Sequence, residues 1–122
     1  VIITQNQTRF GNASGTGVMS LVFRSDASNG SYIDHIRAKP TGTSAVTVAR
    51  VWFFNGGNQT WANNCTLFTE ASLPVITLSE TVSQQDVPLP IKVGLPPNYN
   101  VYVTIGTTVG AGWIFTGVGG DY

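Results

Sequence analysis

The stretch that most constrains the fold is residues 45–54 (AVTVARVWFF), the longest run of β-branched and aromatic residues in the chain. In an extended strand, both faces of this stretch are largely apolar, so we expect it to be covered on both sides, at least in part. Turn residues bracket it, with Pro40-Thr41-Gly42 before it and residues 55–58 (NGGN) after it, which favours a strand over a buried helix. A central strand with hairpin partners on either side is the skeleton of a β-sandwich.

Further segments alternate in the same way and end at turn residues, at spacings of about a dozen residues. They are residues 18–24, 32–38, 65–73, 87–93, 101–105 and 113–118, with 1–4 as a weaker candidate. No segment has convincing helical periodicity. The sequence therefore predicts an all-β fold, an antiparallel β-sandwich of jelly-roll or Greek-key topology with about eight strands. We expect residues 1–17 to form an N-terminal arm or irregular segment and residues 18–122 to form a single domain.

Charge is scarce and balanced. Charged residues make up 10% of the chain, against about 25% in an ordinary soluble domain, and six basic side chains cancel six acidic ones. Arg37, Lys39 and Arg50 are expected on neighbouring strands, but three cations make only a modest patch, so no nucleic-acid partner is expected. No apolar run approaches the length of a membrane span, and residues 1–5 lack the regions of a signal peptide. An uncharged polar surface suits a protein that packs against neighbours or one that lives outside the cell.

The chain offers no recognisable catalytic or metal-binding set. Cys65 is the only cysteine, and the clustered Cys or His ligands of a metal site are absent. The only histidine, His35, follows Asp34, but adjacent strand residues point to opposite faces, so Asp34 is not expected to orient the imidazole. We therefore expect no enzymatic activity, no catalytic residues, no cofactor and no metal.

Two features indicate binding surfaces. Trp61 lies in a polar loop beside Asn58 and Gln59, where its ring is a candidate platform for stacking a sugar. The alternative is a loop aromatic that folds back over the sandwich edge or into a subunit interface. Pro88 and Pro90 remove backbone donors from strand 87–93, which predicts that this strand lies at an edge or an opening of its sheet.

The order of several segments resembles small all-β virion proteins of tailed bacteriophages. These segments are 30–38 (GSYIDHIRA), 45–50 (AVTVAR), 67–74 (LFTEASLP), 95–103 (LPPNYNVYV), Gly112-Trp113 and 119–122 (GGDY). The resemblance covers residues 30–122 and leaves the arm 1–17 outside. Proteins of this family are capsid decoration (cement) proteins or, less often, head-fibre or tail components, and they bring no catalytic residues.

The resemblance implies a virion protein, assembled in the host bacterial cytoplasm, that binds the outer capsid lattice and stabilises it. Its partners would be the major capsid protein and copies of itself, as a homo-oligomer with a trimer favoured, and no membrane. Contacts would come from apolar surface and from strand addition at exposed edges, multiplied by copy number. The candidate intersubunit residues are Gln5, Arg9 and Phe10 in the arm and Pro88 and Pro90 at the edge. The alternative is a carbohydrate- or receptor-binding module of a tail or head fibre that binds a host surface glycan.

Overall fold

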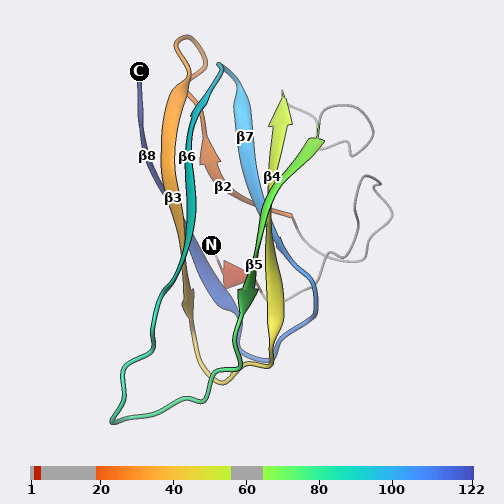
Figure 1. The fold of residues 1–122 in the computed structure, drawn as a ribbon, viewed down its shortest axis with the longest axis vertical. Coiled ribbons are helices and arrows are strands. Elements are labelled where there is room, and N and C mark those ends of the chain that lie inside the picture. Colours follow the sequence, from red (N-terminus) through yellow and green to blue (C-terminus); the bar gives the residue numbers. More distant parts are fainter. Residues whose placement is uncertain (1, 4–18, 56–64) are drawn as a thin grey trace.

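The computed structural model describes residues 2–3, 19–55 and 65–122. Figure 1 shows two layers of strands that face each other. The strands are β1 (Ile2–Ile3), β2 (Ser20–Arg24), β3 (Ser31–Pro40), β4 (Thr47–Asn55), β5 (Cys65–Leu73), β6 (Val87–Leu95), β7 (Tyr99–Ile105) and β8 (Trp113–Asp121). Each expected strand overlaps one of these elements. Among the described residues, no helix is long and apolar enough to cross a membrane.

The strands form two antiparallel sheets. One has the order β1-β8-β3-β6 and the other the order β2-β7-β4-β5. The pairs are nested, with β4 beside β5, β3 beside β6, β2 beside β7 and β1 beside β8, so the chain folds as one long hairpin that is wound across two layers (Figure 1). This nesting is the jelly-roll arrangement of a β-sandwich, and it confirms the predicted fold class.

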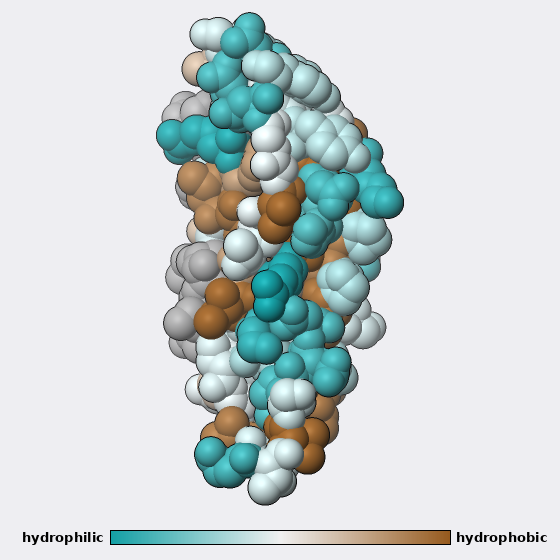
Figure 2. Space-filling view, turned by 90° about the vertical axis from the view of Figure 1, so that its left-hand side faces the viewer, coloured by the Kyte–Doolittle hydropathy of each residue, from teal (hydrophilic) through white to brown (hydrophobic). Residues whose placement is uncertain are grey.

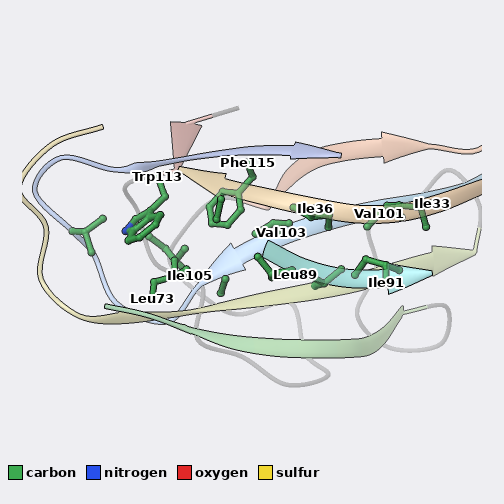
Figure 3. Close-up of a cluster of buried hydrophobic side chains, with 14 of the residues drawn as sticks. Ile33, Ile36, Leu73, Leu89, Ile91, Val101, Val103, Ile105, Trp113 and Phe115 are labelled. Carbon is green, nitrogen blue, oxygen red and sulfur yellow. The ribbon is translucent and has the colours of Figure 1, made fainter. Parts of the chain in front are cut away.

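The core lies between the two sheets and is built from alternate residues of the strands. Trp113 and Phe115 of β8 and Ile36 of β3 pack from one sheet toward Val103 and Ile105 of β7 in the other (Figure 3). All five side chains are at most 1% exposed. Removing such apolar surface from water, at about 25 cal/mol per Å², is the main stabilising contribution to the fold.

Strand β4 is buried on both faces, as its composition predicts. Val51 points into the core between the sheets, whereas Trp52 and Phe54 belong to a second buried cluster with Tyr102 of β7. Trp52 Nε1 donates a 2.8 Å hydrogen bond to Thr104 Oγ1, and the rings of Phe54 and Tyr102 meet edge to face with centroids 5.0 Å apart. The indole N–H therefore has a hydrogen-bond partner inside the protein, which offsets the free-energy cost of removing it from water.

Candidate functional site

The outer face of the β1-β8-β3-β6 sheet carries several titratable side chains. Figure 2 views the molecule from this side and shows a hydrophilic band that crosses the face between hydrophobic patches. The charged residues on this face include Asp34, His35, Arg37 and Lys39 of β3, Lys92 of β6, and Asp86, which directly precedes β6. The geometry of these groups therefore decides whether the described residues could support acid–base chemistry.

A β-bulge in β3 brings Asp34 and His35 together. Ile33 pairs with Gly119 of β8 but His35 pairs with Val118, so β3 holds one extra residue at this point. The bulge turns both side chains to the outer face, where Asp34 Oδ2 lies 2.7 Å from His35 Nδ1. The prediction that Asp34 would not orient the imidazole is therefore wrong, because it assumed a regular strand.

The Asp34–His35 pair does not complete a catalytic set. Its side chains are 46% and 34% exposed, and no described residue forms a hydrogen bond to the second ring nitrogen of His35. Nucleophilic catalysis needs a serine, threonine or cysteine within hydrogen-bond reach of the base. The geometry fits a ligand contact or a surface ion pair better than a charge relay.

The nearby cations are paired with a carboxylate. Arg37 Nε donates to Asp86 Oδ2, and Lys39 Nζ lies 3.3 Å from Asp86 Oδ1. The hydrogen bond from Arg37, reinforced by Lys39, holds the pKa of Asp86 below its ordinary value of 3.8. Arg50 does not join them, because β4 lies in the other sheet and Arg50 Nε donates to Glu70 Oε2 at 2.9 Å. The expectation that these three cations lie on neighbouring strands is therefore wrong, and they do not form one basic patch.

Cys65 begins β5 and packs against the cluster of Trp52, Phe54 and Tyr102. Burial raises the pKa of its thiol to about 11. Near neutral pH the group is therefore almost entirely protonated, which makes it a poor nucleophile and a poor metal ligand. Among the described residues, no group of three or more His, Cys, Asp or Glu side chains could hold a metal ion.

Strand β6 lies at the edge of its sheet, as its prolines predict, because β3 is its only partner among the described strands. Just after β3, the Thr41 N–H donates to the Gly112 carbonyl at 3.1 Å, so the backbone groups of Thr41 point toward the β8 side. Because the direction of these groups alternates along a strand, those of Arg37 and His35 also point toward β8 and away from β6. Arg37 and His35 are the register partners of Pro88 and Pro90. The two proline nitrogens therefore face the open edge, and an incoming strand would find no donor at either position. A subunit contact through Pro88 and Pro90 stays a prediction, and it would use their side chains and carbonyl oxygens, since neither residue has a backbone N–H.

One end of the sandwich presents apolar side chains to solvent. The β3–β4 connection and the long β5–β6 connection are joined there by an antiparallel bridge, in which Ser44 and Ile76 exchange hydrogen bonds of 2.9 and 3.0 Å. Leu78 N–H donates to Thr43 Oγ1 at 3.0 Å, which fixes the longer connection against the shorter one. Figure 1 shows this connection extending beyond the strands at the lower end of the molecule.

We call this region the end surface and define it by four exposed side chains. They are Val46 (62% exposed), Val75 (64%), Leu78 (55%) and Val82 (66%). Within residues 41–46 and 74–85, the only charged residue is Glu80. Residues 75–86 are mainly polar in the sequence, and no binding surface was expected there. The sequence signal for this surface was the four large apolar residues in an otherwise polar segment, namely Val75, Ile76, Leu78 and Val82.

The remaining candidate residues lie outside the described part of the chain. They are Trp61, Asn58 and Gln59, proposed to contact a ligand, and Gln5, Arg9 and Phe10, proposed to contact a neighbouring subunit. Comparison with protein-family models, with curated proteins and with solved structures gave no match.

Proposed function

We propose that this chain is a non-enzymatic structural protein of a tailed-bacteriophage virion, acting as a capsid decoration protein. In this role it binds the outer capsid lattice, together with copies of itself as a trimer, and stabilises the shell. The observation that carries the proposal is the end surface, where four large apolar side chains are each more than half exposed. Exposed apolar side chains that gather in one region are a feature of docking surfaces, and these four support docking at this end.

The chemistry of the end surface suits many weak, repeated contacts. Full burial of one valine or leucine side chain contributes about 1.5–3 kcal/mol, which is modest for a single site. Copies linked in an oligomer and repeated over a lattice multiply such contacts. Because Glu80 is the only charge in residues 41–46 and 74–85, the contact would depend little on ionic strength.

The architecture and the titratable groups also support this role. Jelly rolls occur in viral capsid and lectin domains, which is an argument by analogy of fold. The protonated thiol of Cys65 and the half-exposed Asp34–His35 pair supply no activated nucleophile. The net charge of zero likewise favours packing over long-range electrostatic attraction.

The test is co-sedimentation of the purified chain with capsid shells of the phage that encodes it, stripped of this protein. The double variant Leu78→Ser/Val82→Ser replaces two exposed apolar side chains and should lower shell occupancy by at least about tenfold, as expected for the loss of two buried apolar groups. Ser83→Ala/Gln85→Ala changes the same connection and should bind like the wild type. Equal binding of both variants would show that the end surface is not the docking surface.

A further inference from the structure

Tyr32 lies on the outer face of β3 between two glycines. Its register partners are Gly94 on β6 and Gly120 on β8, and its side chain is 38% exposed. A Cβ atom at Gly120 would meet nothing within 4 Å, and Gly120 is not among the residues with positive φ. Neither packing nor backbone conformation therefore requires glycine there. Glycine inside a strand weakens it, and often marks a place where a ligand or another backbone approaches closely.

A second tyrosine extends over the same part of the face. Tyr122 follows β8, and its N–H donates to the Gly30 carbonyl at 3.2 Å. Its hydroxyl lies 2.7 Å from the position that a Cβ at Gly94 would occupy, so the side chain reaches across to β6 and fills the space that this glycine leaves. With 67% of its surface exposed, Tyr122 forms a second wall beside Tyr32.

Polar groups lie along β3 next to the two rings. The bulge places the Asp34 carboxylate and the His35 imidazole directly after Tyr32 on the same face, and both are partly exposed. No hydrogen bond among the described residues engages the hydroxyl of Tyr32 or Tyr122. An aromatic face, a gap beside it and partly exposed hydrogen-bonding groups at its rim are therefore found together.

We propose that Tyr32, Tyr122 and the Asp34–His35 pair form a binding platform for a neutral saccharide. The C–H face of a pyranose ring stacks on Tyr32 in the space above Gly120, and the sugar hydroxyls bond to the carboxylate, the imidazole and the phenols. The rim holds groups of both signs, because the exposed Lys92 of β6 lies opposite the bulge that carries the Asp34 carboxylate and the His35 imidazole. This platform is separate from the end surface and does not rest on the decoration role.

The experiment is binding of the full chain to an array of neutral oligosaccharides built from glucose, galactose, mannose and N-acetylhexosamines. The best neutral glycan is then titrated by calorimetry. Tyr32→Ala should weaken binding at least about tenfold, because it removes the stacking surface, and Tyr32→Phe should keep most of the affinity. Gly120→Val should also weaken binding, because it fills the gap beside Tyr32 without touching the ring.

Thr116→Val is the matched control, since it places the same side chain on the outer face of β8 opposite Arg37. It should bind like the wild type, and thermal unfolding should show that every variant is folded.

Two results would contradict the proposed saccharide platform. One is that no neutral glycan on the array binds the wild-type chain. The other is that binding survives in Tyr32→Ala and Gly120→Val but is lost in Trp61→Ala, which would assign the sugar to the Trp61 loop. A decoration protein that binds no glycan would still pass the shell test, so the two proposals fail separately.

Discussion

Gly119 and Gly120 are neighbours in β8 with opposite surroundings. A Cβ at Gly119 would lie 2.2 Å from the Tyr32 carbonyl oxygen and 3.0 Å from the ring of Phe23, whereas one at Gly120 would meet nothing within 4 Å. Gly119 is thus required by the close approach of β3 and Phe23 on the inner side. No close contact requires glycine at position 120, and the lack of a side chain there leaves open space beside Tyr32.

This difference predicts unequal effects of the same substitution. Gly119→Ala should lower the free energy of unfolding by about 1–3 kcal/mol, because the added methyl group forces backbone to move in a packed region. Gly120→Ala should change it by less than about 0.5 kcal/mol, since the methyl group enters open space. Chemical denaturation of both variants measures this directly. Equal destabilisation would contradict the assignment of inner and outer faces in β8.

At the level of elements, the two neighbouring edges of the sandwich differ. In β6, Pro88 and Pro90 present no N–H to the open edge. β5 is the edge strand of the other sheet and contains no proline. The hydrogen bond from Gly106 N–H to the Val48 carbonyl shows that the backbone groups of Val48, and by alternation those of Arg50, point toward β7. By the same alternation, the backbone N–H and C=O of Glu70 in β5 face outward, away from β4. The prolines protect β6 against unwanted strand pairing.

The variant Pro88→Val/Pro90→Val should therefore increase self-association, because it restores two outward donors to an exposed edge strand. Light scattering at rising protein concentration would show larger species than in the wild type. Pro74→Val is the control, since Pro74 follows β5 and takes part in no ladder. If the double variant stayed as monodisperse as the control, the edge prolines would not have the protective role assigned to them.

Element positions could be predicted from the sequence because alternation and turn residues are local signals. The run at 45–54 became β4 (Thr47–Asn55), and the prolines of strand 87–93 correctly predicted an edge. The contact between Asp34 and His35 could not be predicted in this way. It depends on a one-residue bulge, which is set by the register of β3 against β8 and not by residues near it in the chain.

The candidate surfaces were harder to predict for a related reason. Val75, Leu78 and Val82 belong to a connection whose polar composition hides them, and only the tertiary structure shows that no described element covers them. The platform around Tyr32 depends on glycines 62 and 88 residues away in sequence that β6 and β8 place beside it. Exposure and cross-strand neighbours are properties of the assembled sheets, so local pattern carries little information about them.

At the scale of the whole molecule, the distribution of charge and of exposed apolar side chains is the feature on which the proposed role depends. Its net charge is zero, the described cations of β3 and β4 are paired with carboxylates, and four aliphatic side chains that are each more than half exposed lie at one end. A jelly roll with this distribution can place one end on a lattice while the outer face of the β1-β8-β3-β6 sheet stays accessible. Under the proposed role, we expect the protein to bind the capsid by its end surface and to leave the Tyr32 platform exposed to solvent.

The measurement that tests this account most directly is quantitative mass spectrometry of purified virus particles from the source of this chain, scaled to the major capsid protein. Decoration of the lattice predicts a copy number close to that of the capsid protein or a simple fraction of it. A handful of copies would contradict decoration and would move the chain to a tail or fibre. Absence from the particle would contradict the virion role itself.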